Sequence, residues 1–476
     1  MKYHSTRGGA SGMSFKDMLL SGYACDGGML LPENIPTVSR ETLRSWAGLP
    51  YAELAFKIAS CFIEESDIPA SDLQRIFEQA YSTFSVPEVV PLAHLKDGLV
   101  VVELFHGRSL AFKDLSLACL GNFYNYFLRE DDRHMTLLVC TSGDTGSAAI
   151  EAVRGFDKVD IIVMLPRGRI TQIQELMMTT VLDSNVHVYR MDGSSDDIDI
   201  VVRDLFGDPA FVQQHNLASP SSLNFTRVLV QMVHIYYTYL QLCPSADCEL
   251  EMICPTGGAG NVTAGMLARE MGLPAKFVCA VNDNNVLSRI MDNGQCNLGD
   301  VHVTLAPAMD IQFAYNLERI WHLCSNGDST LIKKIMKEVD DGNVNVPVNV
   351  LNAMKKAIKV YTVKGDEEIK SAIKRCWDEN EYNICPHTAI GVAYYYSHGK
   401  DIKGLSAVLA TASPLKFPDA IKASEVPVPN SERMHQLVVS PARHIDLEKG
   451  QDWTAIIRAK VEEISQQKPS QTTVDP

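Results

Sequence analysis

Seven short apolar segments recur along the central part of this 476-residue chain, and helical segments separate most of them. Each apolar segment is rich in β-branched residues and is bounded by glycine, proline or polar residues. Such runs are typical of strands buried on both faces of a parallel sheet, and their alternation with helices is typical of βαβ units. The sequence therefore predicts an α/β protein with doubly wound parallel sheets. The expected strands cover residues 99–105, 136–141, 160–166, 185–191, 249–255, 276–282 and 405–412, and the expected intervening helices include 144–155, 171–181, 223–242 and 261–271.

The regions around this core are less regular in sequence. Helical patterns cover 40–64 and 70–84, and 311–377 is mostly helical in pattern with a loop over 342–347. The polar end of the chain predicts about 12 flexible terminal residues. We expect an N-terminal region over 1–92, an α/β core over 93–430 whose smaller subdomain covers roughly 115–225, and a C-terminal extension over 431–476.

Charge excludes some classes of partner. The chain has 58 acidic residues against 43 lysines and arginines, and its formal net charge is −15. An acidic chain without a basic stripe is unsuited to nucleic acid or to an anionic membrane surface. Residues 228–246 lack charged side chains, but glutamine, histidine and tyrosine interrupt them, so we expect a core helix and no membrane span. The first residues lack the apolar segment of a secretory signal, and we expect a cytoplasmic protein.

The twelve cysteines show no metal-binding pattern. No pair has the C-x-x-C spacing, and the nearest pair, Cys243 and Cys248, has no companion histidine or cysteine cluster. Several cysteines lie in apolar runs, where a free thiol behaves as a small buried hydrophobic group. The pattern predicts reduced thiols and no metal site.

The loops after the expected strands carry the residues of chemical interest, because ligands bind beyond the carboxyl ends of parallel strands. The first loop, FHGRSLAFKD over 105–114, places Lys113 in an apolar, aromatic setting. A desolvated lysine has a depressed pKa and can act as a nucleophile or a base. Local composition by itself favours a surface lysine that opens a helix.

Two glycine-containing loops lead from strands into helices. TSGDTGSAAIEA over 141–152 is either an anion-binding helix N-terminus or an ordinary capped turn. PTGGAGNVTAGM over 255–266 has three glycines in four residues, which lets several N–H groups face one anion. It is not a Walker A loop, because Met266 stands where a lysine is required. A small phosphate group fits this loop best.

A fourth loop, ATASPLKFPDA over 410–420, brings the hydroxyl groups of Thr411 and Ser413 to the same sheet edge, although a plain turn explains them equally well. None of the four loops decides the function alone. Together they supply a buried lysine, two anion-binding helix ends and a hydroxyl donor. A lysine and a phosphate cradle on one α/β scaffold are what a pyridoxal 5′-phosphate (PLP) enzyme needs.

These segments resemble those of the threonine synthase family. FHGRSLAFKD is similar to the family sequence F-H-G-P-T-L-A-F-K-D, and Lys113 matches the lysine that binds PLP. The other matches follow in the same order and include STRG (5–8), DGGMLLP (26–32), TSGDTG (141–146), PRGR (166–169), SSLNFTR (221–227), PTGGAGN (255–261) and PHTA (386–389). An animal branch of the family is the most similar. The resemblance implies the tryptophan-synthase-β-like fold, fold type II of the PLP enzymes, with the site between two doubly wound sheet domains.

The resemblance also implies cofactor roles position by position. Lys113 would form the internal aldimine and then shuttle protons. Thr411 would face the pyridine nitrogen, and Asp144 would lie near the 3′ oxygen of the cofactor. The cofactor phosphate would be held by Gly257, Gly258, Ala259, Gly260 and Asn261.

Substrate roles are implied in the same way. Ser142 and Thr145 would bind the substrate carboxylate. The substrate phosphate would be bound by Ser222, Asn224 and Arg227, with Arg108, Arg167 and Arg169 as further candidates. We expect these positive side chains to form a locally basic site within an acidic protein. The expected assembly is a monomer or a homodimer that acts on a small phosphorylated amino acid.

Departures from the family pattern bear on the reaction. Arg108 and Ser109 replace Pro-Thr beside Lys113, Gly258 replaces Asn in the cofactor loop, and Cys385 replaces an acidic residue. None of them removes the lysine or the phosphate sites, but they put in doubt the stereospecific water addition that ends threonine synthesis. The animal branch implies a simpler phospho-lyase reaction, from O-phosphothreonine and O-phosphohomoserine to 2-oxobutyrate, ammonia and phosphate.

Three alternatives stay open. True threonine synthase would convert O-phosphohomoserine to threonine on the same scaffold. A non-catalytic binding or signalling module would keep the fold without the reaction. A serine or threonine dehydratase would act on an unphosphorylated amino acid, and the 222–227 segment favours a phosphorylated one.

Overall fold

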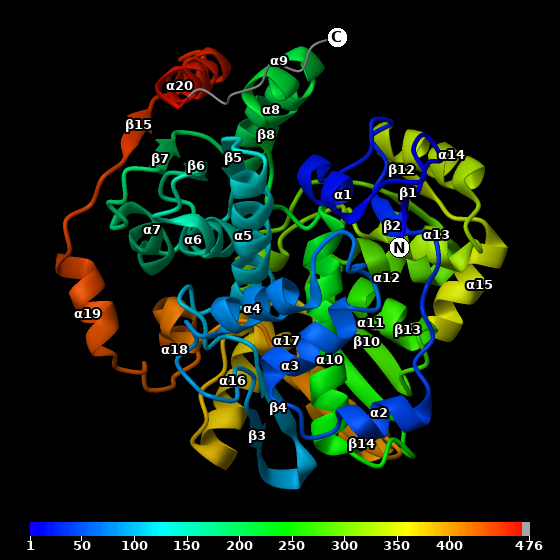
Figure 1. Cartoon of the computed structure of the whole chain (residues 1–476). Coiled ribbons are helices and arrows are strands. Elements are labelled where there is room, and N and C mark those ends of the chain that lie inside the picture. Colours follow the sequence, from blue (N-terminus) through cyan, green and yellow to red (C-terminus); the bar gives the residue numbers. More distant parts are fainter. Residues whose placement is uncertain (469–476) are drawn as a thin grey trace.

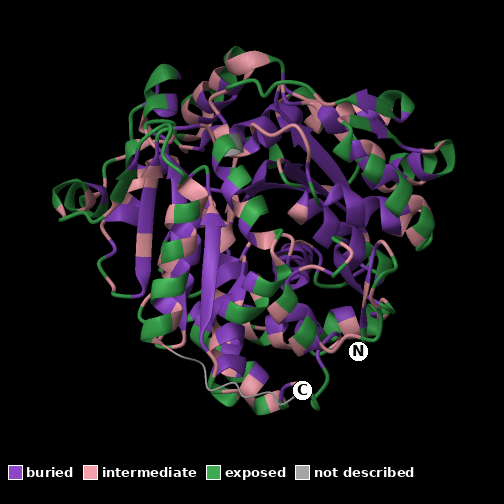
Figure 2. Cartoon of the chain, turned by 90° about the horizontal axis from the view of Figure 1, so that it is seen from above, coloured by how far each residue is buried: buried purple, intermediate pink, exposed green. Residues whose placement is uncertain are grey.

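Two sheets, each covered by helices, organise the computed structural model, which describes residues 1–468 apart from the side chains of residues 195 and 196 (Figure 1). The inner strands of both sheets are almost entirely buried, and exposed positions lie mainly on the outer helices and loops (Figure 2). The prediction of an α/β protein with parallel sheets is confirmed. All seven expected strands and all four expected intervening helices are present within a few residues of their expected bounds.

The larger sheet has six strands in the order β13-β10-β9-β14-β4-β3. All neighbouring strands are parallel except the edge pair β3 and β4. The carboxyl ends of β4, β9 and β14 therefore meet at one edge, and the loops that follow them lie together. The bounds are β3 Leu92–His94, β4 Val100–Glu103, β9 Leu250–Pro255, β10 Ala275–Val281, β13 Ile358–Thr362 and β14 Leu405–Ala410.

The smaller sheet has five parallel strands in the order β15-β7-β6-β5-β8. Helices α6 and α8 pack on it, and α5 packs closely on α6. The strands are β5 Met135–Cys140, β6 Val159–Pro166, β7 Val186–Met191, β8 Leu217–Ala218 and β15 Ile445–Leu447. The helices are α5 Lys113–Glu130, α6 Asp144–Val153, α7 Gln172–Thr179, α8 Ser195–Phe206 and α9 Pro209–His215.

The N-terminal region is built onto the helices of the core. A two-stranded antiparallel sheet joins β1 (Tyr3–Ser5) to β2 (Leu30–Pro32). Tyr3 is fully buried and donates a hydrogen bond to the carbonyl of Phe62. Two of the N-terminal helices pack on α5 and on α10 (Phe225–Leu242) because their apolar stripes face the core. The helices are α1 Phe15–Ser21, α2 Arg40–Trp46, α3 Tyr51–Ala59 and α4 Ala70–Tyr81.

The region expected to be helical over 311–377 is helical in most of its length, but it contains two strands that the pattern did not indicate. Residues 343–345 of the expected loop form β12, which pairs with β11 (Gln295–Asn297). Residues 358–362 form β13, the edge strand beside β10. The helices are α13 Leu317–Cys324, α14 Ser329–Asp340, α15 Val348–Ala357 and α16 Gly365–Asn380.

The C-terminal extension returns from the larger sheet to the smaller one (Figure 1). After α17 (Pro386–His398) and α18 (Pro418–Ala423), α19 (Glu432–Val439) packs on α7, β15 pairs with β7, and α20 (Trp453–Gln467) packs on α8. Residues 465–467, at the start of the terminal stretch that the sequence predicts to be flexible, belong to α20. Residues 469–476 lie outside the described part of the chain.

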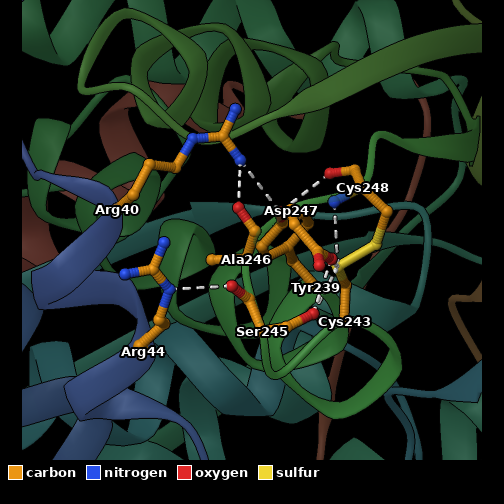
Figure 3. The surroundings of a disulfide bond; sticks show 8 residues. All are labelled: Arg40, Arg44, Tyr239, Cys243, Ser245, Ala246, Asp247 and Cys248. Atoms are coloured by element: carbon orange, nitrogen blue, oxygen red, sulfur yellow. Dashed lines mark hydrogen bonds between the residues drawn. A yellow bond between two sulfur atoms is a disulfide. The ribbon is translucent and has the colours of Figure 1, made fainter.

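The structure joins Cys243 and Cys248 in a disulfide at the turn between α10 and β9 (Figure 3). The turn brings their Cα atoms to 6.4 Å, within the range of a disulfide. Side chains of α2 hold this turn: Arg40 donates to the carbonyl of Ala246, and Arg44 donates to the carbonyl of a neighbouring serine. The prediction of reduced thiols is wrong for this pair. Within residues 1–468, no helix is long and apolar enough to cross a membrane.

Candidate active site

Lys113 begins α5 and is placed by a loop that is hydrogen-bonded to the end of β14. The backbone N–H of Phe112 donates to the carbonyl of Thr411 at 2.8 Å, and the N–H of Ser413 donates to the carbonyl of Leu110 at 3.0 Å. Leu110 adopts a positive φ of 57°, which only a tightly held backbone imposes on a leucine. The loop and the strand end therefore fix the start of α5 and the Lys113 side chain with it.

Asp114 supports the same loop through a hydrogen bond to its backbone. Its Oδ2 accepts a hydrogen bond from the N–H of Ser109 at 2.8 Å, and the side chain is buried. A Cβ on Gly107 would lie 2.4 Å from Asp114, so glycine is required there. Burial raises the pKa of Asp114 to about 6, although the bonds to Ser109 and the charge of Lys416 act in the opposite direction.

The Lys113 amine lies in a largely buried and positively charged environment. Its side chain is 17% exposed, and its Nζ is 4.0 Å from Oδ2 of Asp144. Burial lowers the pKa of Lys113, and so do the nearby charges of Lys416 and Arg227, whereas Asp144 raises it. The net effect is a lowered pKa, which favours the neutral amine that a nucleophile or base must have.

Asp144 stands at the start of α6 and is bound by two side chains besides its approach to Lys113. Its Oδ1 is 2.7 Å from Nζ of Lys416 and accepts a hydrogen bond from Nε2 of Gln174 at 2.9 Å. Burial alone would raise the pKa of Asp144, but the charges of Lys416 and Lys113 outweigh it and hold the pKa well below the ordinary value. Asp144 is therefore a carboxylate.

The glycine loop connects β9 to α11 (Gly260–Glu270). Ala259 caps this helix in the left-handed conformation, with φ 58° and ψ 15°. The first N–H groups of a helix have no partner within the helix, and a left-handed residue before them turns the loop N–H groups to the same side. The side chain of Asn316 holds the loop by donating to the carbonyl of Gly258 at 3.0 Å.

Arg227 approaches the same space from the first turn of α10. The guanidinium is buried, and it donates to Oγ of Ser116 at 2.7 Å and to the carbonyl of Pro220 at 2.6 Å. Burial lowers the pKa of Arg227 to about 10, so the group stays positive at neutral pH. Its hydrogen-bond partners are neutral, and its charge is available to an anion.

These elements enclose a cavity of about 230 Å³ at the carboxyl ends of the strands of both sheets. Its polar lining combines the lysine, the glycine loop and the arginine. Its other walls include Phe112, Cys140, Ala308 and Met309. A lysine with a lowered pKa beside a phosphate-sized cradle can form a covalent link to an aldehyde and move a proton at a bound substrate.

The structure brings eleven of the sixteen residues indicated by sequence to this cavity. They are Lys113, Asp144, Thr145, Ser222, Arg227, Gly257, Gly258, Ala259, Gly260, Asn261 and Thr411. Of the residues expected to make the site basic, Lys113 and Arg227 line it. The local positive charge therefore has fewer contributors than the five lysine and arginine side chains that we expected.

The other five residues do not line this cavity. Ser142 is exposed. The turn is held by the hydroxyl oxygen of the neighbouring Thr141, which accepts the N–H groups of Gly143 and Gly146. Asn224 caps α10 through its side-chain oxygen and donates to the carbonyl of Leu19, so both of its polar atoms have partners.

Three arginines also lie elsewhere. Arg108 is 51% exposed and pairs with Glu151 on α6. Arg167 forms a two-pronged ion pair with Glu448 of the C-terminal extension, at 2.8 and 2.9 Å. Arg169 is exposed on the loop after β6. Two of the arginines that were expected to bind substrate, Arg108 and Arg167, are thus bound by carboxylates of this acidic chain.

Sequence reasoning missed several polar residues of the site. Lys416 is fully buried beside Asp144. It lies in the ATASPLKFPDA segment, where a lysine among apolar residues could have indicated a buried, paired charge. His387 lines the cavity, and its Nε2 accepts the N–H of Ala308 at 3.1 Å. Gln231 lies one helical turn after Arg227, but nothing in the local sequence marks it.

Comparison with known proteins agrees with this geometry. Family models match most of the chain: "Threonine synthase N terminus" over residues 2–81, "Pyridoxal-phosphate dependent enzyme" over 89–413 and "Threonine synthase, C-terminal" over 388–459. The chain belongs to the threonine synthase family. Its fold is fold type II of the PLP enzymes, and its cofactor is PLP, as the sequence predicts.

Two relatives show where in the family the chain lies. "Threonine synthase-like 2" of Xenopus laevis is 44% identical over 471 residues, which are 98% of this chain and 100% of the relative. The crystal structure of PLP-bound threonine synthase from Brucella melitensis is 34% identical and has a TM-score of 0.91, over 97% of this chain and 99% of that one. The predicted similarity to an animal branch of the threonine synthase family is confirmed.

The residues of the cavity fit PLP. A Cβ on Gly257 would lie 3.0 Å from the carbonyl oxygen of Ala308, whereas nothing lies within 4 Å of a Cβ on Gly258, which faces open space. The loop can therefore pack closely on one side and admit a phosphate on the other. Gln231 has a buried side-chain oxygen without a hydrogen-bond partner among the described residues, and it lies against Gly260. Such an unused polar atom is expected where a polar ligand binds.

Proposed function

We propose that the chain is a PLP-dependent phospho-lyase, a carbon–oxygen lyase that acts on phosphates. It would release phosphate from O-phosphothreonine and O-phosphohomoserine and give 2-oxobutyrate and ammonia. The observation that carries the proposal is the position of Arg227 in the same cavity as Lys113 and the glycine loop. A buried guanidinium with neutral partners is suited to a second phosphate, distinct from that of the cofactor.

PLP, when bound, supplies an electron sink that stabilises negative charge on the substrate Cα. Lys113 Nζ would take the proton from Cα, because a lowered pKa favours the neutral form of the amine. Arg227 would bind the leaving phosphate and stabilise the charge that develops on it. A phosphate on the β-carbon can leave directly after the first proton transfer. A phosphate on the γ-carbon requires a second proton transfer, from Cβ.

Two observations support a lyase. Arg108 and Ser109, which replace the Pro-Thr of the family pattern, stand beside the lysine, and the backbone N–H of Ser109 is bound by Asp114. The chain is 44% identical to "Threonine synthase-like 2" of Xenopus and 34% identical to the Brucella synthase, and it is the resemblance to this animal branch that implies a phospho-lyase. An elimination needs no water activated on one face of a bound intermediate, so it tolerates changes at this position better than threonine synthesis does.

Threonine synthase is the second candidate. The TM-score of 0.91 with the Brucella threonine synthase favours it, since the two chains share their backbone over nearly their whole lengths. The two reactions share the first proton transfer and the loss of phosphate and differ in the fate of the product. An inactive binding module on the same fold is a third reading, which a cofactor-binding assay addresses.

Product analysis separates these functions. The holoenzyme is incubated with O-phosphothreonine or O-phosphohomoserine, and phosphate, 2-oxobutyrate and threonine are measured. We expect equimolar phosphate and 2-oxobutyrate with both substrates, and neither product from Lys113→Ala. Threonine from O-phosphohomoserine would establish the synthase instead. A protein that binds PLP and yields neither product would contradict both enzyme assignments.

Further parts of the proposal concern the setting of the enzyme. We place it in the cytoplasm, as a monomer or a homodimer with a small phosphorylated amino acid as substrate. The net charge of −15 supports the exclusion of nucleic acid and of anionic membranes from its partners. Ser142, Asn224, Arg108, Arg167 and Arg169 are left out of the proposed substrate site, because they do not line the cavity.

A further inference from the structure

Lys416 is a second lysine of the active-site region, and it is more deeply buried than Lys113. Its side chain has no exposed surface, and it lies in a short 3-10 turn, Pro414–Lys416, in the loop that follows β14 and contains Thr411. Its Nζ donates to the carbonyl of Ser109 at 2.8 Å and is 2.7 Å from Oδ1 of Asp144. A buried ammonium group requires such partners, because burial of an unpaired charge is costly.

Lys416 and Gln174 together fix the orientation of Asp144. Both bind Oδ1, at 2.7 and 2.9 Å, which leaves Oδ2 directed toward Nζ of Lys113 at 4.0 Å. Gly143 permits this arrangement, because a Cβ there would lie 2.5 Å from the Gln174 side chain. The carboxylate is thus held by one cation and one amide and faces the other lysine with its second oxygen.

We propose that Lys416 is a positioning residue for the Lys113 amine: it holds Asp144 in place and balances the negative charge that Asp144 brings to the site. An unbalanced carboxylate 4.0 Å away would favour the ammonium form of Lys113, which cannot attack an aldehyde. With Lys416 in place, Asp144 can orient groups near Lys113 without stabilising the ammonium form of Lys113. The inference rests on the role proposed for Lys113.

Other charged and titratable groups around Lys113 come from its own helix, α5, and from three further helices. Arg227 of α10 adds positive charge, and Asp144 of α6 adds negative charge. Asp114 follows Lys113 on α5. His387 of α17 has a pKa lowered to about 4 by burial, so it is neutral at physiological pH. Lys416 is therefore the group that offsets Asp144 through direct contact.

The step that depends on Lys416 is the capture of PLP. The neutral Lys113 amine adds to the aldehyde carbon, a C=N bond forms, and one water leaves with the aldehyde oxygen. The amine must lose its extra proton to the solvent before it can attack. Removal of Lys416 should therefore move the pH dependence of capture to higher pH, and removal of Asp144 should move it to lower pH.

The test follows PLP capture by the apoenzyme through the visible absorption band of the bound cofactor, at a series of pH values and without substrate. We compare wild type, Lys416→Met, Asp144→Asn and the double variant. The exposed lysine of α18 provides the matched control Lys422→Met. A charge within 4–6 Å shifts a pKa by about 1–3 pH units. We expect a shift of about one pH unit or more upward for Lys416→Met, a downward shift for Asp144→Asn, and a double variant near wild type.

Each outcome bears on the proposal. A Lys416→Met profile that overlaps those of wild type and Lys422→Met overturns it. A double variant that behaves no better than Lys416→Met also overturns it, since a purely structural lysine would not be rescued by removal of Asp144. If Lys416→Met does not fold, Asp144→Asn is compared with the double variant, and the same upward shift is expected. Because no substrate is present, failure of the proposed lyase reaction would leave this result intact.

Discussion

Arg227 and Arg169 are both candidate phosphate ligands by sequence, but they occupy opposite environments. Arg227 is buried in the cavity, whereas Arg169 is exposed outside it. We expect Arg227→Gln to lower kcat/KM for phosphorylated substrates by about 10²–10³, the usual loss when one charged donor to a developing anion is removed. Arg169→Gln should change kcat/KM by no more than about twofold, because Arg169 is exposed and does not line the cavity, and surface substitutions of this kind also leave stability within about 0.5 kcal/mol.

The control for the arginine pair is the affinity for PLP, measured by titration of the apoproteins. Arg227 lies outside the glycine loop, so Arg227→Gln should keep most of that affinity while it loses turnover. Equal losses of kcat/KM in the two variants would show that Arg227 does not contact the substrate phosphate.

Asp114 carries a cost in stability that depends on pH. Burial raises its pKa from the ordinary 3.8 to about 6, so the folded state binds more protons than the unfolded state between these values. Stability therefore falls as pH rises from about 4 to about 6, by at most roughly 3 kcal/mol, and the loss is fully present above pH 6. We expect Asp114→Asn, which can still accept the N–H of Ser109, to raise Tm at pH 7.5 by a few degrees.

Thermal unfolding of both proteins at pH 4 and pH 7.5 checks the stability effect. At pH 4 Asp114 is protonated in the folded protein, and the two Tm values should nearly coincide. A Tm advantage of Asp114→Asn that is equally large at pH 4 would assign the effect to packing and not to the charge.

At the scale of elements, the glycine loop between β9 and α11 offers two neighbouring glycines in different surroundings. A Cβ on Gly257 would lie 3.0 Å from the carbonyl oxygen of Ala308, which is backbone and cannot rotate away, whereas a Cβ on Gly258 meets nothing within 4 Å. Overpacking of this kind costs about 1–3 kcal/mol. Gly257→Ala should therefore shift the loop and weaken PLP binding by about tenfold or more. Gly258→Ala should also weaken PLP binding, because its methyl group would enter the open space that admits the phosphate. Fluorescence titration of the apoproteins with PLP measures both, and wild-type affinity in both variants would mean that the loop shifts freely.

Sequence periodicity was sufficient to predict the buried strands and helices. It was insufficient to predict short or half-exposed strands, which depend on partners far away in the chain. The strands β9 and β10 are apolar except for one charged residue each, because both of their faces are largely buried. The strand β13, IKVYT, is half exposed and alternates lysine with apolar residues next to a helix, so the helical pattern around it concealed it. β15 has three residues and exists only because β7 is beside it.

The same distinction holds for the site. The parts of the site that are formed by the backbone, such as the glycine loop and the turn before α6, depend on local sequence and could be predicted. Side-chain pairs between distant parts of the chain could not be predicted. Lys416 forms an ion pair with Asp144, which is 272 positions away, and Arg167 forms one with Glu448 of the C-terminal extension. Charge type alone did not separate Arg227, which lines the cavity, from Arg167, which does not.

At the scale of the whole molecule, the chain crosses between its two sheets more than once. The smaller sheet is built from residues 135–218 and is completed by β15 and α20 from the C-terminal extension. Ile457, Val461 and Ile464 of α20 are buried in the core of this sheet with Leu138 and Ile162. The extension is therefore part of the smaller subdomain, although the larger sheet lies between them in sequence.

This arrangement predicts that α20 stabilises one sheet and not the other. Ile457→Ala removes a fully buried side chain and should cost about 2–5 kcal/mol in the smaller subdomain. Hydrogen exchange measures the two sheets separately: protection of β6 and β7 should fall, while that of β9 and β10 stays near wild type. Val439→Ala on α19, whose side chain is 82% exposed, is the matched control and should change neither. Equal loss of protection in both sheets would show instead that the two subdomains unfold as one cooperative unit.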